Sequence, residues 1–208
     1  MNVCPRAWDA PPTVHWLNHD PELEDAINLL AAELGFQIVA YSSVEAFLER
    51  STADARDCIL FNWLMPAANG DAAAELLRSR RDRMPIIGFV RGASVRMAVE
   101  GMQQGAFDFH AWPIEAQVLG ASITRAVAKF EAERELAVQR ACVERRLASL
   151  TDRESEVMEF ATQGLSTRDI AARLGISPKT AEHHRARLLN KMQVANMTQL
   201  IVLVLRNR

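Results

Sequence analysis

The sequence predicts an α/β domain with a doubly wound, five-stranded parallel sheet, followed by a long connecting helix and a small all-α domain. Three observations lead to this. Short apolar runs alternate with amphipathic stretches from Thr13 to about Pro113, as strands and helices alternate around a parallel sheet. A stretch rich in Ala, Arg and Glu follows from about 115 to 148, with Gly120 as its only glycine and no proline. From 148 onward, short helical patterns are separated by glycine.

Five short runs are almost continuously apolar, which is typical of strands that helices cover on both faces. They are 13–17 (TVHWL), 36–40 (FQIVA), 58–62 (CILFN), 85–90 (PIIGFV) and 108–112 (DFHAW). In such a sheet the functional groups gather where the strands end. Residues 13–120 are therefore the predicted α/β domain, and residues 1–12 a tail in front of it.

The helices between these strands are predicted from capping residues and periodicity. The first, 21–34, has Asp20 as its N-cap, Pro21 at its first position and Gly35 after its end. Leu23, Ala26, Leu29 and Leu30 form its apolar repeat. Further helices are expected at 44–50, 71–81 and 94–104.

The connecting helix, 121–147, has apolar positions that do not keep one heptad frame. Ile123, Ala126 and Phe130 fit the first frame, and Leu136, Val143 and Leu150 fit a second. An uninterrupted coiled coil is therefore not predicted. A connector with part of a dimer seam and a plain solvated helix both remain open.

Composition excludes several classes of protein. With 24 Lys and Arg against 26 Asp and Glu, the whole chain is not a polycation. The longest apolar run, Leu200 to Leu205, is too short to span a membrane, and no signal-peptide pattern follows Met1, so we expect a cytoplasmic protein. Cys4, Cys58 and Cys142 lack the spacing of a disulfide framework or a zinc site. No metal or cofactor is predicted.

The segment 148–208 contains a helix-turn-helix pattern and a local positive charge. It holds nine basic and six acidic residues. Ser166 and Asp169 form the capping-box start of a short helix, which Gly175 ends. Ser177 and Pro178 then begin a second helix that runs to about Met192. Its inward positions are Ala181, Leu188 and Met192. Two helices joined by a short glycine turn, the second rich in basic residues, are typical of a helix-turn-helix.

The run LTDRESEVMEFATQGLSTRDIAARLGISPKTAEHHRARLLNKMQVANMTQL resembles the LuxR-type DNA-binding domain, and SPKTAEHHRARLLNKM resembles the FixJ branch of response regulators. In that family the second helix of the motif enters the DNA major groove. The resemblance implies base contacts by Glu182, His183 and Arg185 or Arg187, and phosphate contacts by Lys179, Thr180 and Lys191. Glu182 has a second interpretation, as a partner in a helix ion pair. His183 and His184 are adjacent and point in different directions, so they do not form a metal site.

The last helix, about 197–206, carries more apolar side chains than a small domain easily covers. In the resembling family this helix forms the dimer contact, which implies that Leu200 and Leu203 face a partner subunit. The alternative is that these side chains close the core of the domain itself.

The segment 13–120 resembles the receiver domain of the same regulators, without its chemistry. Typical receivers carry two acidic residues after the first strand for Mg²⁺, a phosphoacceptor Asp after the third, a hydroxyl after the fourth and a Lys after the fifth. The corresponding residues in this sequence are Asn18 and His19, Asn62, Val90, and Trp112. Neutral amides supply neither a nucleophilic carboxylate nor the charge that binds a hard cation. Trp16, Trp63 and Trp112 are expected either to fill the vacated site or to line a site for an unphosphorylated ligand.

Taken with these patterns, the resemblance implies a DNA-binding transcription regulator of FixJ/NarL type, with a degenerate receiver that acts without aspartyl phosphorylation. We expect it to bind a two-half-site element in double-stranded DNA as a homodimer. The alternative is a protein-interaction module whose receiver pairs with another regulator or a sensory partner. An enzyme is not predicted, because His15, His19 and His110 have no Ser or Cys nucleophile in a suitable motif.

Overall fold

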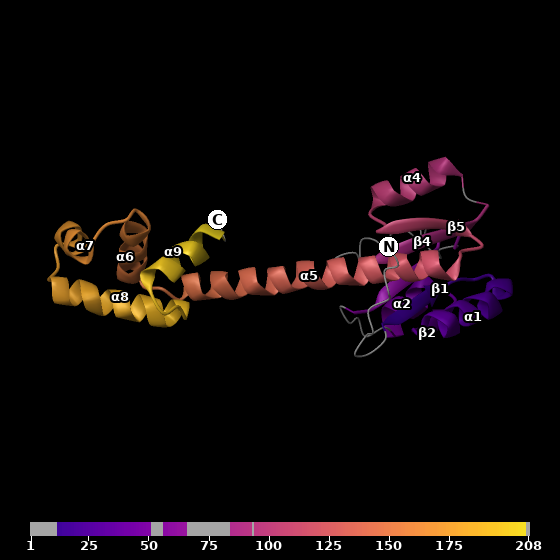
Figure 1. The fold of residues 1–208 in the computed structure, drawn as a ribbon, viewed down its shortest axis with the longest axis horizontal. Helices are drawn as coiled ribbons and strands as arrows, with labels where there is room; N and C mark the ends of the chain where they lie inside the picture. Colours follow the sequence, from indigo (N-terminus) through magenta and orange to yellow (C-terminus); the bar gives the residue numbers. More distant parts are fainter. Residues whose placement is uncertain (1–11, 51–55, 66–83, 93, 207–208) are drawn as a thin grey trace. The chain divides into compact units, whose positions relative to one another are not determined.

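The computed structural model describes residues 12–50, 56–65, 84–92 and 94–206 (Figure 1). The chain divides into two compact units, residues 1–134 and 135–208, and each is described by itself. The predicted helix 71–81 and all of the predicted tail except Pro12 lie outside the described residues.

The first unit is built on a five-stranded parallel sheet, as the sequence predicts, and its strand order is β2-β1-β3-β4-β5. Its strands are β1 (Thr13–Leu17), β2 (Gln37–Tyr41), β3 (Cys58–Asn62), β4 (Ile86–Arg91) and β5 (Asp108–Trp112). β2 begins one residue later than predicted, because the Phe36 N–H still bonds to the Ala31 carbonyl at the end of the preceding helix.

Helices cover both faces of this sheet. Its helical elements are η1 (Pro21–Leu23), α1 (Glu24–Leu34), α2 (Val44–Arg50), α4 (Val95–Gln104) and α5 (Ala116–Ala148). α1 and α5 pack on one face, where Ile27 and Ile123 meet Trp16 of β1 in a buried cluster. α2 packs on the other face, where Phe47 meets Phe61.

The buried side of α1 differs from the predicted one. Leu23, Ile27 and Ala31 are buried, whereas Leu29 is 73% exposed. The predicted repeat included Leu29, but a helix period of 3.6 residues turns position 29 away from positions 27 and 31. The prediction for Leu29 was therefore wrong, while the helix itself is in place.

The second unit contains the end of α5 and four further helices. These are α6 (Asp152–Thr162), α7 (Thr167–Leu174), α8 (Pro178–Met192) and α9 (Met197–Arg206). They enclose a core that includes Val157, Ile170, Leu188 and Leu200. Val143 of α5 is part of the same core, so the domain takes in the last turns of the connecting helix.

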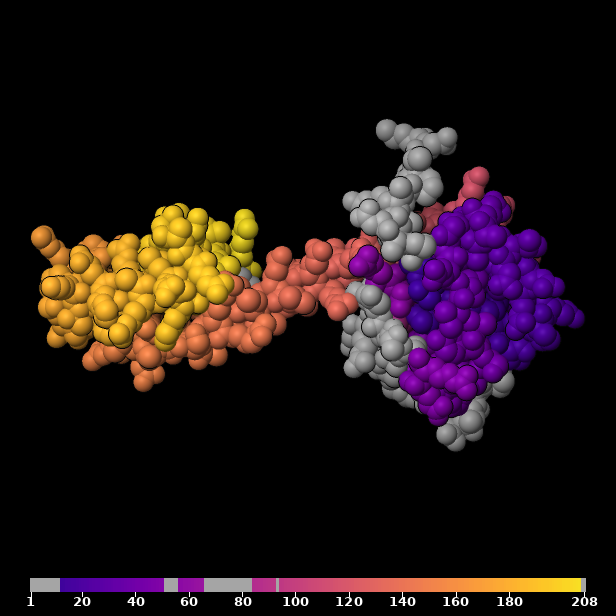
Figure 2. Space-filling view, turned by 90° about the horizontal axis from the view of Figure 1, so that it is seen from below, coloured from indigo at the N-terminus to yellow at the C-terminus, as the bar shows by residue number. Residues whose placement is uncertain are grey.

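The structure of α9 contradicts one predicted dimer contact. Leu200 is fully buried in the core of its own domain, so it does not face a partner subunit, and Leu203 packs partly against the same core. The outward side of α9 instead carries Val202 and Leu205, which are 44% and 60% exposed. Figure 2 shows the C-terminal residues, in yellow, on the surface of this domain.

No single helix of the described part of the chain is long and apolar enough to cross a membrane. Among the residues that the structure describes, α8 and α9 taken together, bent by 52°, meet that criterion of length and composition.

Candidate nucleic-acid interface and carboxyl edge of the sheet

The two helices of the motif begin and end as their capping residues predict. The Ser166 hydroxyl accepts from the Asp169 N–H at 3.3 Å, and the Asp169 carboxylate accepts from the Ser166 N–H at 3.3 Å. Gly175, with φ 65°, ends α7 in the left-handed conformation. Ser177 then caps α8 by accepting from the Thr180 N–H at 3.1 Å. The Thr180 hydroxyl lies 2.8 Å from that of Ser177, so it belongs to the same cap.

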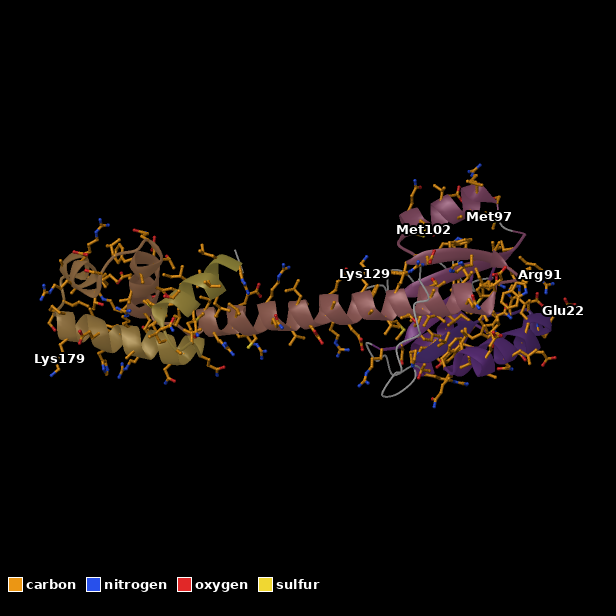
Figure 3. The ribbon with its side chains drawn as sticks, viewed as in Figure 1. Glu22, Arg91, Met97, Met102, Lys129 and Lys179 are labelled. Atoms are coloured by element: carbon orange, nitrogen blue, oxygen red, sulfur yellow. The ribbon has the colours of Figure 1, made fainter. Side chains whose placement is uncertain are left out.

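α8 presents one long exposed side. Its opposite side is buried through Ala181, Leu188 and Met192, as predicted. The exposed residues on the outward side are Lys179, Glu182, His183, Ala186, Arg187 and Asn190. Figure 3 shows Lys179 extending away from the domain. Sequence reasoning missed Ala186 and Asn190, because it followed charge. The helical spacing 179, 183, 186, 190 would have identified them.

The outward side carries several groups that can recognise a base pair. Arg can donate two hydrogen bonds to guanine, Asn can pair with adenine, and Glu can accept from the cytosine amine. Glu182 has no ion-pair partner within 4 Å in the part of the chain that the structure describes, so the alternative of a helix ion pair finds no support. His183 is exposed, while His184 is half-buried.

Arg185, which the resemblance gave as an alternative to Arg187 for a base contact, is not free on this side. Its Nη1 donates to the Thr167 hydroxyl of α7 at 2.7 Å, and the side chain is half-buried. The bond ties the first turn of α7 to the middle of α8. Arg168, the next residue of that turn, is exposed, and sequence reasoning did not single it out.

Lys191 is also held inside the domain rather than on the outward side. Its Nζ lies 2.6 Å from Glu154 Oε2 and 2.8 Å from the Ser149 carbonyl oxygen. The Glu154 side chain is only 3% exposed. Burial acts to raise the pKa of Glu154, but hydrogen bonds from Lys191 and Thr151 outweigh it and hold the pKa below its ordinary value. Lys191 thus compensates a buried carboxylate.

At the carboxyl edge of the sheet, the ends of β1 and β3 are joined by two amides. Asn62 Nδ2 donates to Asn18 Oδ1 at 2.8 Å, and Asn62 Oδ1 accepts from the Leu64 N–H at 3.1 Å. The Asn18 amide donates onward to the Asp20 carbonyl. Both side chains belong to buried residues. The pair is a neutral hydrogen-bonded network in which each amide nitrogen donates a bond and each amide oxygen accepts one.

The charged groups near this edge are engaged with one another. Arg91, at the end of β4, lies 3.1 Å from the Glu22 carboxylate and 3.5 Å from the Asp20 carboxylate (Figure 3). Asp20 also accepts from the Glu22 N–H and so caps η1. His19 is exposed. Asp20 therefore serves a helix start and an arginine.

The remaining predicted residues of this edge are apolar and packed. Val90 is fully buried. Trp16 stacks on Phe89 with ring centroids 4.5 Å apart, and Trp112 lies 5.8 Å from Phe89. These three rings form part of the buried cluster beneath α1 and α5. The observed packing agrees with aromatic side chains that fill space.

Trp63 belongs to a separate aromatic pair between β4 and α4. Its ring lies 5.2 Å from that of Phe109. A Cβ atom at Gly88 or Gly101 would come within 2.5 Å or 2.8 Å of the Phe109 ring. The two glycines therefore make the room that these rings occupy.

Two family models match the chain. Residues 16–124 match the response regulator receiver domain, and residues 148–204 match the bacterial regulatory proteins of the luxR family. Together they cover both units, and the luxR match contains α7 and α8.

Known relatives are similar over nearly the whole chain. The transcriptional regulatory protein FixJ of Bradyrhizobium diazoefficiens is 30% identical over 193 residues, which is 93% of this chain and 94% of FixJ. The tetrathionate response regulatory protein TtrR of Salmonella typhimurium is 29% identical over 194 residues, 91% of this chain and 90% of TtrR. Among solved structures, the response regulator StyR gives a TM-score of 0.83 at 27% identity and covers 95% of this chain and 100% of its own.

Proposed function

The chain belongs to the FixJ/NarL-type response regulators, the DNA-binding transcription regulators of two-component systems, and from that premise we propose that it acts without aspartyl phosphorylation and binds a two-half-site DNA element as a dimer. The observation that carries the proposal is the direct hydrogen bond between Asn62 and Asn18 at 2.8 Å. By the resemblance to receivers, these residues stand where the phosphoacceptor and a metal-binding carboxylate belong.

Three features of the carboxyl edge support independence from phosphate. An amide is not a nucleophile for phosphoryl transfer. Asn18 and Asn62 together offer no negative charge to a hard cation that prefers carboxylate oxygens. Val90 has no hydroxyl to bind a phosphoryl group. The active state is then set by intrinsic stability, by protein concentration, or by a protein or small ligand that binds one state more tightly.

DNA recognition is assigned to the outward side of α8. Glu182, His183, Arg187 and Asn190 are proposed to reach base edges, and Ala186 to allow close approach. Lys179 and Thr180 at the start of α8, with Arg168 on α7, are proposed to hold phosphates, since helix N-termini favour anions. Arg185 and Lys191 are assigned to the positioning of α8 instead.

Dimerisation is assigned to α9. Val202 and Leu205 lie one turn apart and are both substantially exposed, so they form an apolar strip that a second copy of the domain can cover. Two copies on DNA would place two α8 helices in successive major-groove turns, which is the basis for a two-half-site element.

A selection of random duplex DNA on the purified full-length chain tests the proposal. Arg187→Ala should cost about 1–3 kcal/mol on the recovered site and relax one base position. Lys179→Ala should weaken all duplexes alike and lower the slope of affinity against salt by about one. If neither substitution changes binding, the assigned side of α8 is wrong.

A second candidate function, partner binding through the receiver, has one observation in its favour. Val95, Val99 and Met102 form an exposed apolar strip along α4, and they are 83%, 48% and 46% exposed. Figure 3 labels Met102 on this helix. Failure of the selection to recover a preferred duplex, with regulation retained by Arg187→Ala and lost by Val99→Glu, would favour this second function.

A further inference from the structure

The last turns of α5 are bonded directly to the C-terminal end of α8. Arg146 Nη1 donates to the Met192 carbonyl oxygen at 3.1 Å, and Nη2 donates to Gln193 Oε1. Three residues further along, the Ser149 carbonyl accepts from Lys191. Leu147 packs partly against the core of the same domain. α5 therefore contacts the C-terminal end of α8 through hydrogen bonds, and it also packs against the apolar core of the same domain.

The backbone at this helix end is unusual. Gln193 ends α8 with φ 53° and ψ 48°, and within the described ranges it is the only residue other than glycine with positive φ. Glycine or asparagine is the ordinary residue at such a position. Glutamine is less favourable than glycine in this left-handed conformation, but its side-chain amide supplies the oxygen that accepts from Arg146.

The electrostatics of the contact are favourable. The carbonyls of the last turn carry the negative end of the helix dipole, so a guanidinium placed on the Met192 carbonyl stabilises that end. The planar guanidinium can serve two acceptors at once, here the Met192 carbonyl and the Gln193 amide oxygen. In the middle of α8, Arg185 makes a second contact that holds the helix in place, a hydrogen bond to Thr167 at the start of α7.

We propose that Arg146 is a positioning residue for DNA recognition, which makes the setting of α8 depend on the connecting helix. This inference rests on the proposed function, because it presumes that α8 reads DNA. Within the described part of the chain, the hydrogen bonds of Arg146 to α8 are at its C-terminal end, opposite to Lys179, so Arg146 acts through that helix rather than on bases.

The neighbouring Arg145 provides a matched control. It is exposed, and its Nε donates to the Ala141 carbonyl of its own helix at 3.3 Å. Arg145→Ala and Arg146→Ala remove the same charge one residue apart, but only the second removes the contact with α8. Full-length wild type and both variants are titrated by fluorescence anisotropy against the selected duplex and a scrambled duplex of equal length, with circular dichroism as the check on folding.

Arg146→Ala should lower the ratio of specific to scrambled affinity about tenfold, the effect of losing one good charge-assisted contact. Arg145→Ala should leave the ratio unchanged, because loss of a cation alone weakens both duplexes alike. Arg146→Lys keeps the charge and a hydrogen-bonding nitrogen but not the planar fork that serves both acceptors, so it should restore part of the ratio.

Gln193→Gly keeps the test decisive if Arg146→Ala does not fold. Glycine suits the left-handed conformation, so α8 still ends where it does, while the amide acceptor of Arg146 is lost. We expect a fall in the ratio of about threefold. Wild-type ratios in every folded variant would overturn the inference. A wild type that does not distinguish the two duplexes would overturn the proposed function instead.

Discussion

Substitution of Lys191 by alanine separates a role inside the domain from a role on DNA. Lys191 Nζ lies 2.6 Å from the Glu154 carboxylate, which is 3% exposed. Removal of the lysine leaves that carboxylate with hydrogen bonds from Thr151 and without a cation. Breaking a buried ion pair in this way costs about 3–5 kcal/mol. The Lys191 side chain is 36% exposed, so water can replace part of the interaction, and we expect a loss of about 2 kcal/mol.

The positions of the tryptophans allow the unfolding of the second unit to be measured within the whole chain. All four tryptophans precede residue 113, so tryptophan fluorescence reports on the first unit only. In urea unfolding, the circular dichroism signal at 222 nm reports on both units. In Lys191→Ala the dichroism transition of the second unit should move to lower urea, while the fluorescence transition stays in place.

The matched control is a surface ion pair of α6, the helix that carries Glu154. Arg153 lies 2.9 Å from Glu156, with side chains 52% and 44% exposed. Arg153→Ala should cost less than about 0.5 kcal/mol. The reasoning fails if Lys191→Ala unfolds like the wild type and weakens binding to all DNA duplexes alike, because the lysine would then be a phosphate contact.

The same pair gives a pH dependence with a defined sign. The pKa of Glu154 is lowered in the folded domain, so its contribution to stability is present above the unfolded pKa, about 4.3. It is lost as the pH falls through the lower, folded pKa. The difference in stability between the wild type and Lys191→Ala should therefore shrink below about pH 4.3.

Two further substitutions test the packing of each unit. Changing both Val202 and Leu205 to Glu should lower DNA affinity at least about tenfold with an unchanged dichroism spectrum, whereas Leu200→Glu should unfold the second unit, because it buries a charge in the core. If the double variant binds DNA like the wild type, α9 is not the dimer contact. Gly88→Ala should destabilise the first unit by about 1–3 kcal/mol, seen in the fluorescence transition. Gly120→Ala, whose new Cβ would lie 2.8 Å from a methyl group of Leu34, should be tolerated, since that flexible side chain can move. Equal stability of the two alanine variants would contradict this, because it would show that the Phe109 ring moves aside as easily as the Leu34 side chain.

Local patterns sufficed for the sheet and for the helix starts. The five apolar runs and the caps at Ser166 and Ser177 depend on neighbouring residues, and they appear where expected except that β2 and β4 begin one residue later. The sequence placed Asn18 and Asn62 at strand ends, but it did not predict that β1 and β3 are neighbours in the sheet. Their direct hydrogen bond, between residues 44 positions apart, could not be read from either strand.

The site was predicted less well where partners come from other helices. The family resemblance, together with charge, gave Arg185 and Lys191 DNA contacts, but their partners are Thr167 of α7 and Glu154 of α6. On α9, all six residues from 200 to 205 are apolar. Periodicity therefore could not tell the buried Leu200 from the exposed Val202. Tertiary packing decided both cases.

Gel-shift titration with a phosphoryl mimic tests independence from phosphorylation most directly. Wild type and Asn62→Asp are each titrated on the selected duplex, with and without fluoroberyllate and Mg²⁺. We expect affinities within about twofold in all four conditions, because Asn18 and His19 still provide no metal-binding carboxylate. A tenfold rise in wild-type affinity with fluoroberyllate, about 1.4 kcal/mol of coupling, would show that the Asn18 and Asn62 edge still responds to a phosphoryl group and would contradict the proposal.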